Sequence, residues 1–201
     1  MKKLLVSVFA LALMTACSSE PPKPAEPAKP QAADLVTARS ALQKLYISAH
    51  GWGPDARPYR LESTPNEDSK GRDGKSALWH AGFASAAQHS TRPYSWSGTG
   101  SDRGVSQGVQ DTYNPNNAST QAFDIAFLKT DSDKAFEVAQ QHGGDKILAK
   151  SPDTPVLYIL EWDRVNNELV WHVVYGESRD NAKLKVAVNA STGEFLRIEK
   201  S

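Results

Sequence analysis

Cys17 is the only cysteine of the 201-residue chain, and its thiol is the most reactive side chain that the sequence offers. A single thiol cannot form an internal disulfide, which leaves metal ligation, nucleophilic chemistry or covalent modification. It follows two lysines, an apolar run from Leu4 to Leu13 and the tripeptide Met14-Thr15-Ala16. A basic start, an apolar run of about ten residues and small residues before a cut are typical of a secretory signal, and the run is too short to span a bilayer.

The ending Thr15-Ala16-Cys17 resembles the lipobox of bacterial lipoproteins, with Met14 where that family most often has Leu. The resemblance implies that residues 1–16 are removed and that Cys17 carries a thioether-linked diacylglycerol and an acylated amine. Several acyl chains anchor a protein stably to a membrane. By resemblance to the sorting rules of enterobacterial lipoproteins, Ser18 in place of Asp after the cysteine implies the outer rather than the inner membrane. We expect the anchored protein to face the periplasm rather than the cell surface. The alternative is ordinary secretion with Cys17 buried as a free thiol.

The chain has 23 basic and 23 acidic residues. Removal of residues 1–16 takes away Lys2 and Lys3 and leaves 21 basic and 23 acidic residues, a net charge of −2. So small a net charge gives no reason to expect nucleic acid or a strongly charged partner.

Two Trp-His pairs are the next residues that could form a site. Trp79-His80 and Trp171-His172 lie 92 residues apart, and each tryptophan is followed by an aromatic residue four places later. This recurrence, which we call the echo, predicts an internal repeat. On strands, side chains alternate between the two faces, so each tryptophan would pack against a helix while each histidine faces the other side.

We therefore expect His80, Trp96 and His172 to contribute to a surface that binds a partner protein, since amphipathic side chains suit interfaces. The alternative is that they are ordinary residues of a sheet. The two histidines could also converge on a metal, but no carboxylate or third histidine stands beside either at ligand spacing, so we predict no metal site.

Other motifs fall short of known chemistry. The segment from Gly71 to Ser76 lacks the glycine of a phosphate-binding loop, because Ser69 stands at that position, and we interpret it as a polar hairpin tip. The sequence contains neither a Gly-x-Ser-x-Gly elbow nor a His-Glu-x-x-His motif. We predict no catalytic residues, no cofactor and no enzymatic activity.

The helices and strands that position these residues are expected after a proline-rich tether. Residues 17–32 hold five prolines among alternating lysines and glutamates, a composition that favours extended polyproline II. A first lobe is expected at residues 33–128 and a second at residues 129–201. Each lobe would have one amphipathic helix, the first ending near Gly51 and the second ending at Gly143-Gly144. Strands are expected at 59–62, 77–84, 93–97, 105–113, 156–162, 169–175, 183–188 and 195–198.

The second lobe resembles the PepSY-like domains of secreted and envelope proteins. The resemblance rests on the Trp171-His172-Val173 strand, the hairpin that follows it, and the stretch from Val186 to Phe195, in which Asn189 stands where Asp is usual. It implies two tandem PepSY-like lobes of the α+β class, each with one helix packed on an antiparallel meander. PepSY-like domains are non-catalytic, and some are thought to inhibit peptidases.

Residues 157–162 and 170–174 are apolar on both strand faces, which is expected only where both faces are covered. One helix covers one face. The other face must meet the first lobe or a partner protein, and we expect the first lobe to cover it. The resulting hypothesis is an anchored lipoprotein that binds a protein of the envelope or inhibits a peptidase. Its alternatives are a structural or assembly role in the envelope, and a ligand carrier or enzyme with a pocket between the lobes.

Overall fold

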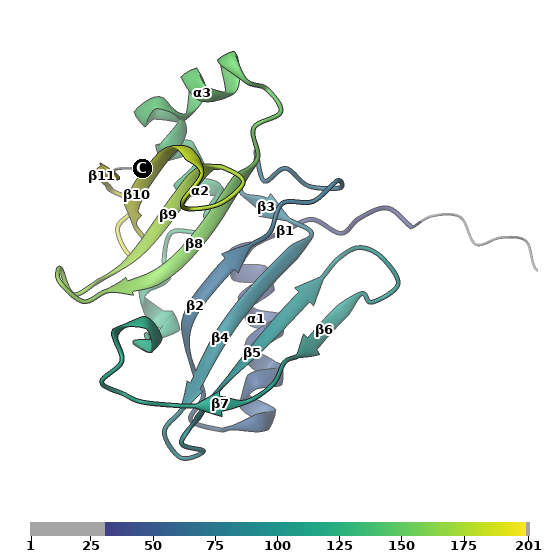
Figure 1. Ribbon diagram of the computed structural model, residues 1–201, viewed down its shortest axis with the longest axis vertical. Helices are drawn as coiled ribbons and strands as arrows, with labels where there is room; N and C mark the ends of the chain where they lie inside the picture. Colours follow the sequence, from purple (N-terminus) through teal and green to yellow (C-terminus); the bar gives the residue numbers. More distant parts are fainter. Residues whose placement is uncertain (1–30, 200–201) are drawn as a thin grey trace, which may run out of the picture. The chain divides into compact units, whose positions relative to one another are not determined.

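The structure is a computed structural model that describes residues 31–199, all of which lie in one compact unit. The predicted signal, Cys17 and nearly all of the tether lie outside the described residues. The unit is of the α+β class, with helices packed on a large antiparallel sheet (Figure 1). The class therefore agrees with the expectation from the sequence.

The first half contains one helix and seven strands, namely β1 (Val36–Thr37), α1 (Ala38–Trp52), β2 (Arg57–Ser63), β3 (Lys75–Ser76), β4 (Leu78–Ser85), β5 (Ser90–Ser97), β6 (Gly104–Gln107) and β7 (Asp111–Thr112). Two short 3-10 helices, η1 (Ala118–Thr120) and η2 (Ile125–Phe127), connect the halves. The second half contains α2 (Ser132–Ala139), η3 (Gln140–Gly144), α3 (Asp145–Lys150), β8 (Val156–Asp163), β9 (Glu168–Gly176), β10 (Ala182–Asn189) and β11 (Phe195–Glu199). Seven of the eight predicted strands match the structure to within a few residues, because their alternating pattern is local. The predicted strand at 105–113 is instead two short strands, β6 and β7, and the sequence did not predict β1 and β3.

One nine-stranded antiparallel sheet runs through both halves in the order β11-β10-β9-β8-β2-β4-β5-β6, and β7 also pairs with β5. The two halves meet where β2 pairs with β8, with Leu61 opposite Leu160. This corrects the expectation that the first half covers a face of the second. The halves join edge to edge, so that their strands share hydrogen bonds rather than stacked faces.

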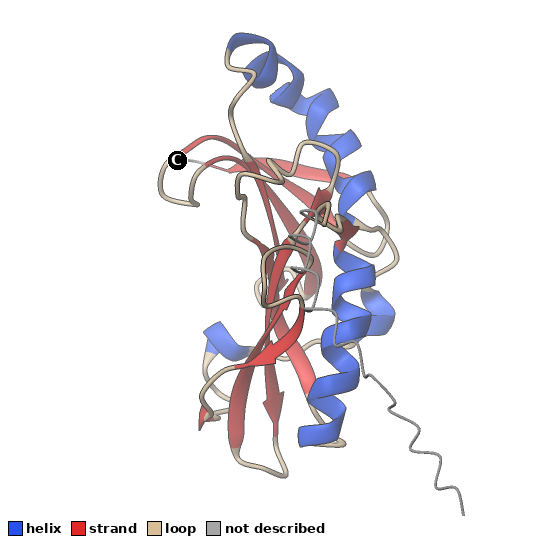
Figure 2. Cartoon of the chain, turned by 90° about the vertical axis from the view of Figure 1, so that its right-hand side faces the viewer, coloured by secondary structure: helices blue, strands red, loops and turns tan. Residues whose placement is uncertain are grey.

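The α1 and α2 helices lie on one side of this sheet, as Figure 2 shows, and α3 continues past the ends of the strands (Figure 1). The α1 helix covers the first half and α2 the second, and their N-termini meet, since Ser132 Oγ accepts a hydrogen bond from the Ala38 amide at 2.9 Å. The hydrophobic core beneath them is continuous from Trp79 in the first half to Trp171 in the second. We call the opposite side of the sheet the open face.

The two tryptophans of the echo hold their helices in the same way. Trp79 Nε1 donates to the Val36 carbonyl at 3.1 Å, just before α1, and Trp171 Nε1 donates to the Thr130 carbonyl at 2.9 Å, just before α2. Both indoles are fully buried. The two Trp-His pairs therefore mark equivalent contacts between sheet and helix in the two halves.

The predicted stop at Gly143-Gly144 is wrong in one respect. Gly143 has a φ of +110° and breaks the helix, but the chain turns back into helix as α3. Gly144 has no side chain because the Tyr175 hydroxyl occupies the space where a Cβ would lie. The glycines therefore produce a kink that fits the helix over β9 and not an end.

The segment from Gly71 to Ser76 is not a free hairpin tip. The Tyr158 hydroxyl donates to the Gly71 carbonyl and accepts from the Gly74 amide, and Ser132 Oγ donates to the Gly74 carbonyl at 2.6 Å. The loop is packed against β8 and the start of α2. Its glycines are needed because both have positive φ values and neighbouring backbone leaves no room for a Cβ.

Candidate functional site

The predicted alternation of the Trp-His pairs is present in the structure. Trp79 and Trp171 face the helices, whereas His80 and His172 face away from them. Trp96 lies opposite Trp79 on the helix side of β5 and is only 4% exposed. Its side chain belongs to the core under α1, so the expectation that Trp96 forms part of a binding surface is corrected.

His80 and His172 lie in one row across the open face. His172 is opposite Ile159 on β8, Ile159 is opposite Glu62 on β2, and Glu62 is opposite His80 on β4. Three strand spacings separate the two histidines, a distance of about 14 Å. They cannot share a metal ion, but they belong to the same surface.

His172 is 6% exposed and lies between two carboxylates. Its Nδ1 lies 2.8 Å from Glu199 Oε2, and its Nε2 lies 3.4 Å from Glu161 Oε1. A neutral imidazole has one N–H and can donate to one of these carboxylates, whereas an imidazolium donates to both. Both ring nitrogens therefore face carboxylate oxygens.

Three arginines extend this cluster over the open face. Arg60 lies 2.9 Å from Glu161 and 2.7 Å from Glu62, and Arg179 lies 2.6 Å from Glu161. Arg197 bridges Glu199 at 3.2 Å and Asp163 at 3.4 Å. These long side chains lie on the side of the sheet where Val170 and Val174 are fully buried.

The cluster lowers the pKa of one of its carboxylates, Glu199. Burial acts to raise the pKa of Glu199, but the hydrogen bond from His172 and the charges of His172, Arg197 and Arg179 outweigh it, so the pKa is lowered. The carboxylate is therefore held in its charged form.

His80 has a different environment. Its Nδ1 lies 2.7 Å from Ser95 Oγ. Burial lowers its pKa below the ordinary value of 6.5, against an opposing effect of Glu62. His80 is therefore a neutral hydrogen-bonding side chain near pH 7, and the two histidines of the echo are not chemically equivalent.

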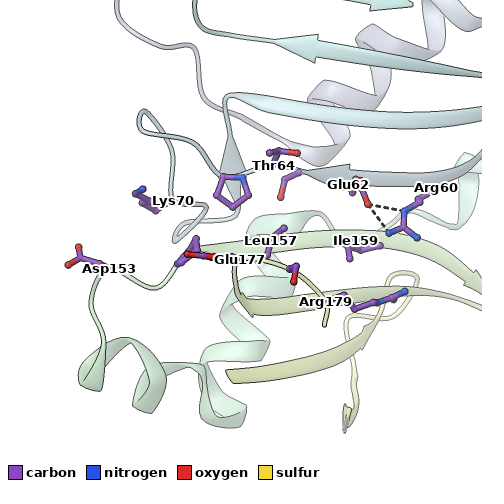
Figure 3. Close-up of a pocket in the computed structure, with 13 residues that line it drawn as sticks. Arg60, Glu62, Thr64, Lys70, Asp153, Leu157, Ile159, Glu177 and Arg179 are labelled. Carbon is purple, nitrogen blue, oxygen red and sulfur yellow. Dashed lines mark hydrogen bonds and ion pairs between the residues drawn. The ribbon is translucent and has the colours of Figure 1, made fainter. Parts of the chain in front are cut away.

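A hollow of about 510 Å³ opens beside this cluster, over the pairing of β2 with β8 (Figure 3). Its lining combines charged, small polar and apolar side chains, namely Arg60, Glu62, Ser63, Thr64, Pro65, Lys70, Asp153, Pro155, Leu157, Ile159, Glu177, Ser178 and Arg179. Lys70, Asp153 and Glu177 are exposed, while Ile159 is buried. The hollow has an apolar wall and a charged rim.

A second hollow of about 300 Å³ lies farther along the same strands and also contains Arg60 and Arg179. Its other lining residues come from β2, β8 and the chain around η1, namely Tyr59, Ala118, Ser119, Gln121, Glu161 and Trp162. We call the two hollows together the seam groove. The groove follows the line where the halves meet, with the Arg60–Glu161–Arg179 ion pairs at its middle.

The sequence did not identify Arg60, Glu161, Arg179 and Glu199 as site residues. Arg60 and Glu161 are 101 positions apart and meet only because β2 pairs with β8. A partial signal was present, since charged residues alternate with apolar ones on β2 and at the end of β8. That alternation places the charges on one face but does not give their partners.

Within residues 31–199, no group of three or more His, Cys, Asp and Glu side chains is arranged to hold a metal ion. In the same part of the chain, no helix has the length and apolar character needed to cross a membrane.

Comparison with known proteins shows that the fold of this chain is similar to that of one solved structure. No family model matches the chain, and no curated protein matches it. The crystal structure of a "putative lipoprotein" from Clostridium difficile 630 is similar, with a TM-score of 0.55 and 12% identity, over 80% of this chain and 93% of that one. At this identity the similarity concerns the fold, and it extends across both halves of the sheet.

Proposed function

We propose that this protein is a lipid-anchored, non-catalytic envelope protein that binds an extended segment of a partner protein in the seam groove. The observation that carries the proposal is the groove itself, which runs along β2 and β8 and combines apolar walls with paired charges. An extended peptide beside eight-residue β8 would be about 25 Å long, which spans both hollows.

The side chains of the groove suit such a peptide. Leu157 and Ile159 offer apolar contact in the first hollow, and Tyr59 and Trp162 offer aromatic contact in the second. Peptide carbonyls need donors, and a guanidinium carries five N–H groups in a planar fork. Arg179 lies on the border of both hollows, so it is the residue we expect to matter most for binding.

The anchor is part of the proposal. We infer from the lipobox-like sequence that Cys17 is acylated at the outer membrane and that residues 18–32 connect it to the body. The fold shared with a protein described as a "putative lipoprotein" supports membrane anchoring, and the choice of the outer membrane rests on Ser18 alone. The PepSY-like character of the two halves and an inhibitory action on a peptidase remain finer forms of the same proposal. Mass spectrometry of the mature N-terminus tests the anchor through the mass of a triacylated cysteine.

Site-specific photocrosslinking in living cells tests the groove. A photoreactive amino acid at Leu157 or Glu62 should give one discrete adduct with an envelope protein, and Arg179→Ala should weaken it. The matched control is the same probe at Lys134, an exposed position on the helix side. Adducts of equal yield from Lys134, or none from the groove while the protein is folded and anchored, would contradict the proposal.

A second candidate function is the carriage of a small ligand. It is favoured by the volume of the first hollow, about 510 Å³, which lies in the range of small-molecule sites, about 300–1,000 Å³. Native mass spectrometry of protein purified from its own envelope separates the two, since a carried ligand appears as a fixed added mass that Arg179→Ala removes.

A further inference from the structure

A second surface lies on the helix side of the sheet, whereas the seam groove lies on the open face. A hollow of about 470 Å³ is lined by α1 and by the chain around η2, namely Arg39, Leu42, Gln43, Tyr46, Ile47, Ile125 and Leu128. We call these residues, together with Phe127, the α1 patch. Ile47 is 75% exposed, Phe127 46% and Ile125 37%, so large apolar side chains protrude around the hollow.

The patch is held in place by Arg39. Its Nη2 donates to the Leu128 carbonyl at 3.0 Å and to the Lys129 carbonyl at 2.6 Å, which fixes the chain after η2 against α1. The apolar residues are therefore presented by two joined elements and not by a loose loop. Contiguous apolar surface of this kind marks a site of contact with another molecule or a membrane.

Basic side chains lie in and around the patch. Arg39 lines it and Lys129 is exposed beside Leu128, while Lys44 lies next to it on α1 with its Nζ 5.9 Å from the Trp96 ring. The α1 helix has no acidic residue, and Asp131 accepts a hydrogen bond from the Arg39 amide at 3.0 Å. The nearest acid of the η2 segment, Asp124, lies 3.5 Å from Arg57 and is balanced by it. Protruding apolar side chains among basic residues are the features of a surface that binds an anionic membrane.

The position of the patch in the chain agrees with this occupant. Fourteen residue steps separate Cys17 from Gln31, the first described residue, and α1 starts seven residues later at Ala38. Even fully extended, those fourteen steps reach only about 50 Å. If Cys17 is anchored as proposed above, the first helix of the body is kept within that distance of the bilayer.

We propose that the α1 patch rests on the surface of an anionic phospholipid bilayer, an inference that depends on the proposed anchor. Ile47 and Phe127 would enter the headgroup region, with Lys44 and Lys129 beside lipid phosphates. Because α1 and the open face are on opposite sides of the sheet, this contact directs the seam groove away from the membrane (Figure 2).

The single cysteine makes a direct test feasible. Ile47→Cys in the full-length lipidated protein is labelled with an environment-sensitive dye and reconstituted into vesicles of phosphatidylglycerol and phosphatidylethanolamine. The matched control is Val165→Cys in the β8–β9 turn, where the native side chain is 92% exposed. We expect a blue shift and quenching by spin-labelled lipid at position 47 only. Both should diminish in phosphatidylcholine vesicles and in the Lys44→Gln, Lys129→Gln double variant.

Two results would overturn the inference. One is a dye at position 47 that is as solvent-exposed and unquenched as the dye at position 165. The other is a blue shift in detergent that grows with protein concentration, which would assign the patch to a second copy of the chain.

Labelling of the unsubstituted protein tests the anchor separately, because Cys17 reacts with the dye only if it is not acylated. If it does react, the anchor proposal fails. Vesicle binding is then measured with the labelled Ile47→Cys, Cys17→Ser protein. Quenching by spin-labelled lipid supports the patch without the anchor, and its absence overturns the patch as well.

Discussion

At the scale of single residues, His80 and His172 occupy the same position in the two Trp-His pairs but have different surroundings. His172 is nearly buried between Glu161 and Glu199, whereas His80 contacts Ser95 and has a lowered pKa. The difference comes from the neighbouring strands, since β9 is followed by β10 and β11 with their charged residues. A lowered histidine pKa has a defined consequence for stability.

Because the folded chain lowers the pKa of His80 below 6.5, the unfolded chain binds more protons than the folded chain as the pH falls through that value. The stability linked to His80 is fully present above 6.5 and is lost between 6.5 and the lower folded pKa. We expect His80→Gln to flatten the fall in the free energy of unfolding between about pH 7 and pH 5.5, measured by urea denaturation. An unchanged slope would show that His80 is not the group that titrates.

The Glu161 carboxylate is the hub of the open-face cluster, with Arg60, Arg179 and His172 around it. Glu161→Gln should cost about 1–3 kcal/mol, because two guanidinium groups lose a charged hydrogen-bond acceptor. The control is Glu137→Gln, which removes the exposed pair with Lys134 and should change stability by less than about 0.5 kcal/mol. Chemical denaturation near pH 7 measures both, and equal effects would show that the hub is no stronger than a surface ion pair.

At the scale of elements, the loop between β2 and β4 is packed tightly against β8. Gly71 has a φ of +69°, and a Cβ there would overlap the Val156 carbonyl oxygen. Gly100 has a similar φ of +72° but no atom within 4 Å of a Cβ. The two glycines share the same backbone conformation and differ only in packing.

This pair separates backbone strain from crowding. Gly100→Ala should cost about 1 kcal/mol, the usual penalty of a left-handed conformation. Gly71→Ala should cost more, about 3 kcal/mol, because the loop must also move away from β8. Thermal unfolding of both variants measures the difference. If the two substitutions cost the same, the docking of the loop on Tyr158 contributes little to stability.

At the scale of the whole molecule, the pairing of β2 with β8 makes the two halves one cooperative structure. Leu61 and Leu160 face each other across the seam, and both are fully buried in a core that continues into each half. Neither half could keep its seam strand paired and its core covered alone. The described residues are therefore expected to unfold in a single transition.

Leu160→Ala tests this cooperativity. It should lower the free energy of unfolding by about 3 kcal/mol and shift the whole transition without splitting it, as followed by tryptophan fluorescence and far-UV circular dichroism. Val165→Ala, at a side chain that is 92% exposed, should leave stability nearly unchanged. Two separated transitions in the Leu160→Ala protein would show that the halves are independent domains.

Some features of the fold could be predicted from the sequence and others could not. The strand positions and the opposite faces of Trp171 and His172 followed from the sequence, because a period of two residues is a local property of the backbone. The same period, applied to β5, would have placed Trp96 with buried Tyr94 rather than on a binding surface. The kink at Gly143 was predicted as a stop, because the sequence did not show that Tyr175 needs the space beside Gly144.

By itself the sequence determined the α+β class, the core-facing positions of Trp79 and Trp171, and the faces on which the histidines lie, all of which depend on neighbours along the chain. Only the tertiary structure decided that the halves join through β2 and β8 and not through stacked faces. That pairing brings Arg60 to Glu161 and forms the seam groove. The physical reason is that strand pairing joins residues about a hundred positions apart through backbone hydrogen bonds, which any sequence with a suitable edge can make, so side-chain patterns do not specify the partner.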